Sequence, residues 1–388
     1  MYRQDIHLGH SKDAGFPASS SYQGTVERLF VEAGVHVNGR QPWDIQVHDP
    51  AFFHRILAHG TLGFGESYME GGWDAEDLDG LVYRLLQACL DTRFHTWDVL
   101  LNTLRARLFN LQGVRRAFEV GRRHYDLSPE LYKRMLGKRL VYSCGYWKEA
   151  ADLDKAQEAK LELVFRKLGL RPGMRILDIG CGWGEALKMA AERYGVESVG
   201  VTISVEQAAY AKQLCAGLPV DIQVMDYRAL QGKFDRILSI GMFEHVGVKN
   251  YRRYMQVARD RLKDDGLFLL HCIGGNTSVH ETDPWIQRYI FPNGMLPSIA
   301  QIGKTTEGLF IMEDWHNFGV DYDKTLMAWR RNFERGWDEV KHEFNNTFYR
   351  MWRFYLSSCA ASFRARKNQL WQIVLSPNGV PGGYVAPR

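Results

Sequence analysis

A glycine-rich turn in the middle of the chain has the residue types and spacing of a ligand-binding loop. It reads G-x-G-x-G, at Gly180, Gly182 and Gly184, between the apolar run 175–179 and a helical pattern at 185–194. Such a turn leaves backbone N–H groups free to approach a ligand beside the positive end of a helix dipole. Because dinucleotide-binding proteins use related loops, the spacing alone leaves the ligand open.

Three further features favour S-adenosylmethionine (SAM) as that ligand. Asp178 lies two residues before the first glycine, where a carboxylate can hold an ammonium group. The turn lacks the later glycine that closes helix–strand packing in the dinucleotide fingerprint. The third predicted strand ends in Asp226, Tyr227 and Arg228, which suit the edge and face of an adenine. Nicotinamide binding is the main competing interpretation.

The second predicted strand departs from the usual plan of SAM-dependent methyltransferases. Most of these proteins end that strand with an acid that grips the ribose hydroxyls. Here the strand ends in VGVTIS, so Thr202, Ser204 and Gln207 must supply the polar contacts. The departure indicates a subgroup of the SAM-dependent methyltransferases.

Alternating helical and apolar segments must position these residues. From Lys160 onward the alternation is typical of a parallel sheet with crossover helices. The predicted strands cover residues 175–179, 198–201, 221–225, 234–240 and 266–272, with a helix at 206–214 after the second. Residues 309–317 and 370–375 are expected to form an antiparallel closing pair around a helical insertion. We therefore expect an α/β fold of the class I SAM-dependent methyltransferase type, Rossmann-like, with a mostly parallel seven-stranded sheet.

The chain before the α/β pattern predicts a smaller N-terminal α+β domain. Residues 1–23 are polar and resemble a loose leader, and helical patterns follow at 26–33 and 81–90, with a glycine-rich run at 60–74 between them. We place the N-terminal domain at 24–120 and the catalytic domain at 121–388, with a helical lead-in over 121–160.

Composition excludes several classes of protein. The 388 residues are 45% hydrophobic, which excludes disorder, and a net charge of +4 over the whole chain does not indicate nucleic-acid binding. Six scattered cysteines form no CxxC pair and no Cys/His metal spacing, so we expect no metal site and a reducing compartment. Neither an apolar signal core nor a membrane-spanning run is apparent, and we expect a cytoplasmic protein.

Six ordered segments together resemble one family, the cyclopropane fatty acid synthases. They are YSCGYW at 142–147, LDIGCGWG at 177–184, GVTISVEQ at 200–207, GMFEHVG at 241–247, LLHCIG at 269–274 and MEDWHNFGVDY at 312–322. The extra N-terminal domain makes the chain more similar to the bacterial phospholipid-acting enzymes than to the mycolic acid branch. The resemblance implies addition of the SAM methyl carbon across a cis double bond of a phospholipid acyl chain, which forms a cyclopropane ring.

The resemblance further implies a bicarbonate ion beside the reacting carbon. Its ligands match Cys144, Glu244, His271, Tyr322 and the backbone N–H of Ile273. Methyl transfer to an alkene leaves a carbocation, and bicarbonate then removes the proton that lets the ring close, so the site must exclude water. We expect Glu244 to accept the bicarbonate O–H, and His271 and Tyr322 to donate hydrogen bonds.

The resemblance also implies a set of SAM-binding residues. From the amino acid end of SAM to its adenine, they are Tyr142, Ser143, Asp178, Gly180, Gly182, Gly184, Thr202, Gln207, Tyr227 and Arg228. His245 is assigned no role, because neighbours on a turn usually point apart. Cys359 lies beside small residues in a helical segment and is expected to be a core thiol, not a nucleophile.

A membrane substrate requires a surface that docks on lipid. Residues 105–139 carry ten Lys or Arg against three acids, and each cation near an anionic membrane contributes about 1 kcal/mol. A solvated helix packing on its neighbour is the alternative interpretation of this basic stretch. The resemblance implies unsaturated phospholipids as partners, a lipid-associated N-terminal domain, a homodimer, and peripheral association with the inner face of the cytoplasmic membrane.

Other functions remain open at this point. A SAM-dependent enzyme could instead form methyl-branched or hydroxylated chains, and plant amine N-methyltransferases look similar around the SAM site. A catalytically inactive SAM- or lipid-binding module is a different class, against which the intact Glu244 and His271 argue.

Overall fold

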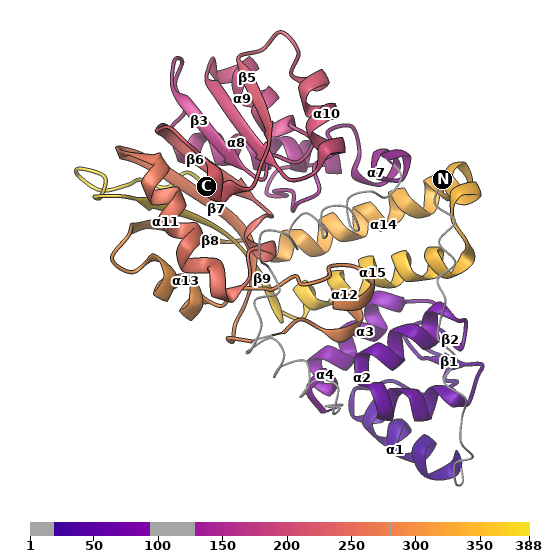
Figure 1. The fold of residues 1–388 in the computed structure, drawn as a ribbon. Helices are drawn as coiled ribbons and strands as arrows, with labels where there is room; N and C mark the ends of the chain where they lie inside the picture. The colour runs from indigo at the N-terminus through magenta and orange to yellow at the C-terminus, as the bar shows by residue number, and fades with distance from the viewer. Residues whose placement is uncertain (1–18, 94–128, 280) are drawn as a thin grey trace.

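The computed structural model describes residues 19–93, 129–279 and 281–388 (Figure 1). Most of the predicted leader and residues 105–128 of the basic stretch lie outside these ranges. So does the predicted domain boundary near residue 120, and the division into 24–120 and 121–388 therefore stays a prediction.

A seven-stranded sheet forms the centre of the α/β part. Its strands are β3 (Arg175–Ile179), β4 (Glu197–Thr202), β5 (Val220–Val224), β6 (Phe234–Ile240), β7 (Leu262–Gly275), β8 (Ile311–Asn317) and β9 (Asn368–Ser376). Their order in space is β5-β4-β3-β6-β7-β9-β8, with β9 antiparallel to both of its neighbours and the other pairs parallel. The predicted mostly parallel seven-stranded sheet is confirmed. The strand order reverses at β3, which is where open parallel sheets bind ligands.

Helices cover both faces of this sheet (Figure 1). One face packs against α8 (Leu153–Leu168), α9 (Glu185–Tyr194) and α10 (Val205–Leu214), and the other against α11 (Tyr251–Arg261) and α13 (Ile299–Thr306). Side chains of a strand alternate between faces, so Ile176 packs with the first set and Leu177 with the second. The glycine turn and the strand ends are thereby fixed between two cores.

The described N-terminal part, residues 19–93, is mainly helical. It contains α1 (Ser19–Glu32), α2 (Ala51–Met69), α3 (Leu78–Gln87) and α4 (Leu90–Arg93), with strands β1 (Gln46–Val47) and β2 (Trp73–Asp74) only two residues long. The predicted leader is wrong at residues 19–23, which belong to α1. Much of the glycine-rich run at 60–74 is helical too, because α2 continues beyond a kink at Gly60, where φ is +57°.

A pair of long helices inserted between β8 and β9 joins the two parts of the molecule. In Figure 1, α14 (Val320–Val340) and α15 (Asn346–Arg364) lie between the sheet and the N-terminal helices. One hydrophobic cluster is continuous from Phe30 and Trp73 through Trp329 and Trp352 to Leu370 of β9. The shorter helices α7 (Pro129–Leu136) and α12 (Pro284–Tyr289) border this cluster, and four 3-10 turns complete the described helices: η1 (Tyr227–Ala229), η2 (Phe243–His245), η3 (Val248–Asn250) and η4 (Lys341–Glu343).

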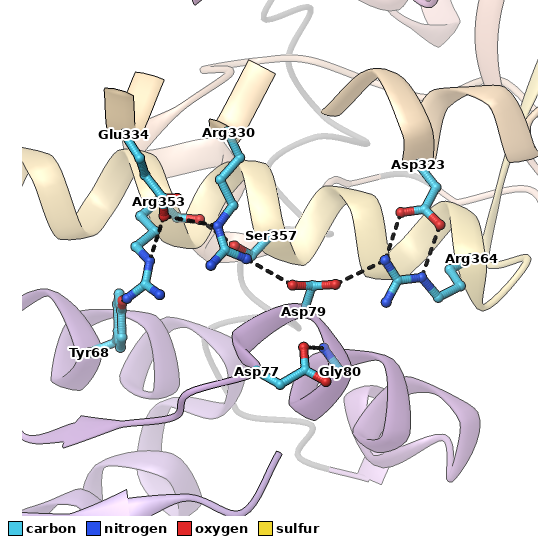
Figure 2. Close-up of polar contacts among 10 residues, drawn as sticks. All are labelled: Tyr68, Asp77, Asp79, Gly80, Asp323, Arg330, Glu334, Arg353, Ser357 and Arg364. Atoms are coloured by element: carbon cyan, nitrogen blue, oxygen red, sulfur yellow. Dashed lines mark hydrogen bonds and ion pairs between the residues drawn. The ribbon is translucent and has the colours of Figure 1, made fainter. Parts of the chain in front are cut away.

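Buried and half-buried charged side chains connect α3, α14 and α15 (Figure 2). Asp79 accepts hydrogen bonds from Arg330 at 2.8 Å and lies 2.9 Å from Arg364 Nη2. Arg330 also donates to Glu334 at 3.0 Å, and Arg364 donates twice to Asp323 at 2.9 Å. We call these five residues the Asp79 network. It links the N-terminal helices to the helical insertion.

The described end of the basic stretch forms ion pairs within the protein. Arg134 lies 2.6 Å from Glu339, and Arg139 pairs with Glu158 and Glu185. These two cations are therefore engaged by carboxylates of the chain itself. In the described ranges, no helix is both long and apolar enough to cross a bilayer.

Candidate active site

A cavity of about 200 Å³ opens where β3, β4 and β6 end. Nine of the ten residues predicted to bind SAM line it: Tyr142, Ser143, Asp178, Gly180, Gly182, Thr202, Gln207, Tyr227 and Arg228. The sequence motifs are thus brought together from four separate segments. Gly184 is the exception.

The three glycines of the turn have different roles. Gly180 and Gly182 both have positive φ, and a Cβ at Gly182 would meet no atom within 4 Å, so its backbone faces open space. Gly184 precedes α9, and a Cβ there would lie 2.8 Å from the Cβ of Ala211 in α10. Gly184 therefore allows α9 and α10 to pack closely, and its predicted contact with SAM stays a prediction.

The residues predicted to bind the ribose and adenine of SAM are held in place by hydrogen bonds among themselves. The Thr202 hydroxyl donates to Gln207 Oε1 at 3.1 Å, and the Gln207 backbone N–H donates to Ser204 Oγ at 3.2 Å. Arg228 donates to both oxygens of Asp226 at 2.7 Å, which fixes its guanidinium over the ring of Tyr227. These contacts hold the predicted ribose and adenine residues in place.

Two buried ionisable side chains, Asp178 and Lys160, line the cavity where the amino acid part of SAM is predicted to bind. Asp178 is 2% exposed, its Oδ1 has no hydrogen-bond partner, and burial raises the pKa of its carboxyl to about 7. Lys160 is fully buried on α8 and donates to the Ser143 hydroxyl at 3.0 Å. A carboxylate with one oxygen that lacks a hydrogen-bond partner, beside a glycine turn that lines the cavity, fits the ammonium and amino acid end of SAM.

Sequence reasoning missed Lys160 as a site residue, although its position carried a signal. The buried positions of α8 include Leu153, Gln157, Lys160, Leu161 and Val164, at helical spacing. A lysine in the apolar stripe of an amphipathic helix must either reach solvent or meet a polar partner inside. Here it lines the cavity.

The carboxylate of Glu244 lies just after β6, in η2. Its Oε1 accepts a hydrogen bond from the backbone N–H of Ile273 at 2.7 Å, and its buried Oε2 has no partner. Burial raises the pKa of this carboxyl to about 7. In the structure the Ile273 amide donates to this carboxylate, and its predicted role as a direct anion ligand stays a prediction.

His271 lies inside β7, level with Ile240 at the end of β6 and opposite Gln372 of β9. Its Nδ1 is 3.4 Å from Gln372 Nε2, and its buried Nε2 has no partner. Burial lowers the pKa of the imidazole well below its usual range, so the ring is neutral. The predicted strand 266–272 was too short, since β7 continues to Gly275.

Cys144 lies against the first turns of α14, the helix that carries Tyr322. The buried Sγ of Cys144 is 3.9 Å from the hydroxyl of Thr325, one turn after the buried Tyr322. Burial raises the pKa of the Cys144 thiol well above its usual range, so it remains protonated. Phe318, just before α14, packs its ring 6.0 Å from that of His271, which connects this group to the sheet.

Three of the residues predicted to bind bicarbonate, Cys144, Glu244 and His271, lie next to the cofactor cavity. Cys144 and Glu244 each neighbour a cavity-lining residue in sequence, and His271 pairs across the sheet with Ile240, which also lines the cavity. Two buried polar atoms without partners, Glu244 Oε2 and His271 Nε2, therefore lie beside the predicted SAM site. Both have the chemistry to hold a small anion that carries a proton, one as acceptor and one as donor.

Two residues predicted to have no chemical role are placed differently. His245 faces the cavity, and burial lowers its pKa to about 4, so the ring is neutral there. Cys359 lies on α15, and burial raises the pKa of its thiol to about 12. A protonated thiol is a poor nucleophile, in agreement with the expectation that Cys359 packs only.

Comparison with known proteins agrees with the resemblance to the cyclopropane fatty acid synthases. The family model described as mycolic acid cyclopropane synthetase matches residues 112–373. The cyclopropane-fatty-acyl-phospholipid synthase of Escherichia coli strain K12 is 51% identical over 93% of this chain and 94% of its own. The tuberculostearic acid methyltransferase UfaA1 of Mycobacterium tuberculosis is 32% identical over 86% of this chain and 83% of its own.

A solved structure supports the cofactor site. Mycolic acid cyclopropane synthase CmaA1, in complex with SAH and CTAB, is 33% identical, with a TM-score of 0.63 over 66% of this chain and 97% of its own. The fold, the glycine turn and Asp178, whose buried Oδ1 has no hydrogen-bond partner, agree with a SAM-dependent enzyme. The chain therefore belongs to the cyclopropane synthase family, and it is a SAM-dependent methyltransferase of the cyclopropane-fatty-acyl-phospholipid synthase type.

Proposed function

We propose that this enzyme converts a cis double bond in the acyl chain of a membrane phospholipid into a cyclopropane ring, with bound bicarbonate as the base. The observation that carries the proposal is the pair of buried polar atoms without partners, Glu244 Oε2 and His271 Nε2. The E. coli relative, named a cyclopropane-fatty-acyl-phospholipid synthase, supports the choice of substrate.

Each residue predicted to bind bicarbonate has a defined task in this proposal. Glu244 is held by the Ile273 amide and exposes its second oxygen, with a pKa of about 7 that suits exchange of a proton near neutral pH. The neutral His271, with Nδ1 near Gln372, offers Nε2–H as a donor. The protonated Cys144 and the phenol of Tyr322 complete a set without net positive charge. SAM, when bound, supplies the methyl carbon.

Aromatic side chains can exclude water from this region. Phe318 packs against His271 and, at 5.3 Å between ring centres, against Tyr146. Tyr142 packs against Trp329 and hydrogen-bonds the hydroxyl of Tyr355 at 2.9 Å. Aromatic faces stabilise a developing cation without attacking it, whereas water would trap it as an alcohol.

The proposal also includes a homodimer that docks peripherally on the inner face of the cytoplasmic membrane. Its support is the family resemblance and the lipid named for the E. coli relative. Because Arg134 and Arg139 are paired with carboxylates of the chain, docking would depend on other cations of residues 105–139 or on the N-terminal part.

The test is to incubate the full-length protein with SAM and vesicles of a mono-unsaturated phosphatidylglycerol, with bicarbonate removed and then restored. We expect NMR signals of cyclopropane ring protons, a rate that falls without bicarbonate, and recovery when it is added back. Equal rates in both buffers would show that bicarbonate is not the base. A methyl-branched or hydroxylated product would overturn the proposed ring closure.

A further inference from the structure

We infer that Lys160 binds the carboxylate of the methionine part of SAM, while Asp178 binds its ammonium group. The inference depends on SAM binding but not on the proposed base or ring closure. It assigns a function to a buried cation that the proposed chemistry does not otherwise use.

The position of Lys160 is the first argument. Its side chain is 0% exposed, lines the cavity, and reaches the end that is also lined by Tyr142, Ser143 and Asp178. An ammonium group has three donors. In the part of the chain that the structure describes, the only hydrogen-bond partner of Nζ is the Ser143 hydroxyl, at 3.0 Å.

The charge of the cavity is the second argument. Burying an ammonium without a carboxylate partner costs several kcal/mol, so such a group is seldom kept without a function. Asp178 offers an opposite charge on the same cavity wall, yet its Oδ1 is also without a partner. One cation and one anion that face a cavity separately are complementary to a zwitterion. The amino acid end of SAM carries both required charges on one carbon atom.

Lys167 shows what a structural lysine looks like in the same helix. It is also fully buried on α8, but its Nζ lies 3.1 Å from Asp314 and 3.2 Å from His316 Nδ1. Lys167 does not line the cavity. It therefore provides a matched control for the removal of a buried positive charge.

The test compares two ligands by calorimetry: S-adenosylhomocysteine, and its decarboxylated analogue, which keeps the ammonium and adenosine. In Lys160→Met we expect affinity for S-adenosylhomocysteine to fall about 10- to 100-fold, the effect of losing a charged hydrogen bond, and affinity for the analogue to change less than about threefold. Lys160→Arg should keep most of the preference for the carboxylate. Lys167→Met, where it folds, should leave the ratio of the two affinities unchanged.

Equal losses for both ligands in Lys160→Met would show a structural role and overturn the inference, as would no loss for either. These binding results are independent of ring formation, so failure here is distinguishable from failure of the proposed function.

The wild-type protein supplies a second measurement should Lys160→Met not fold. The titratable groups that interact with Lys160 are Asp178 of β3, the neutral Cys144 in the segment before α8, and the neutral His271 of β7. Burial lowers the pKa of Lys160 to about 7 in the absence of ligand. The preference for S-adenosylhomocysteine over the analogue should therefore fall from about pH 7 upward, by up to about tenfold per pH unit. Titration of Asp178 affects both ligands and cancels in the ratio. A constant ratio between about pH 6 and about pH 8 would overturn the inference.

Discussion

Two clusters of buried and half-buried ionisable side chains differ in how their polar atoms are used. In the Asp79 network, each arginine meets two carboxylates, and the residues come from helices α3, α14 and α15 (Figure 2). Around the cofactor cavity and the ends of β6 and β7, by contrast, Asp178, Glu244 and His271 each present a buried atom with no partner.

This difference in hydrogen-bond partners predicts that mutations in the two clusters have different effects. A buried ion pair with complete partners holds elements together, while a buried charge left without one lowers stability unless a ligand completes it. The first cluster can therefore be disturbed with an effect mainly on folding. Changes in the second cluster should affect ligand binding or turnover and leave the fold intact.

Glu244→Gln should give the largest effect, a loss of turnover, as expected for a residue of the second cluster. The amide has the same shape and can still accept from the Ile273 N–H, but it removes the negative charge. We expect kcat to fall about 10³-fold, which is about 4 kcal/mol, with little change in the Kd for SAM. Steady-state kinetics and calorimetry measure the two quantities, and the exposed Glu206→Gln is the control. Equal losses in kcat and SAM affinity would contradict the assigned role.

Asp79→Ala should give the next largest effect, in stability. Arg330 and Arg364 lose a shared buried partner, and we expect the free energy of unfolding to fall by about 3 kcal/mol. Urea denaturation measures this, with Asp338→Ala in an exposed surface pair as a control that should change it by less than about 1 kcal/mol. The Kd for SAM of the folded variant should match the wild type. A tenfold weaker Kd with unchanged stability would make Asp79 part of the binding site and remove the distinction.

The smallest expected effect is the pH dependence of stability. Burial raises the pKa of Glu244 from 4.5 to about 7, so the folded protein keeps a proton that the unfolded chain releases. This contribution to stability is fully present below about pH 4.5 and is lost as pH rises through about 7. The gain in the free energy of unfolding on Glu244→Gln should therefore be larger at about pH 8 than at about pH 5, by about 2.5 kcal/mol.

Denaturation curves at the two pH values, without ligand, measure this difference. A variant that is less stable than the wild type at about pH 8 would show that the carboxylate is satisfied in the folded protein. In that case, the contrast with the Asp79 network would fail.

Local sequence patterns were sufficient to predict the α/β part. Strand β6 and helix α9 have the predicted bounds, because period-2 and period-3.6 patterns are properties of short segments. The end of β7 was missed because Ile273 to Gly275 are held by pairing with β9, more than ninety residues later. The helical start of α1 and the continuation of α2 beyond Gly60 likewise depend on packing with distant helices rather than on local propensity.

The sequence by itself determined the family and the sheet, since these depend on residue type and spacing. Only the tertiary structure could decide which polar atoms have partners. It placed Lys160 in the cavity wall, paired the Ile273 amide with Glu244, and showed that Gly184 lies against Ala211 of α10. The physical reason is that desolvation and hydrogen bonding of a buried group depend on atoms that come from distant parts of the chain.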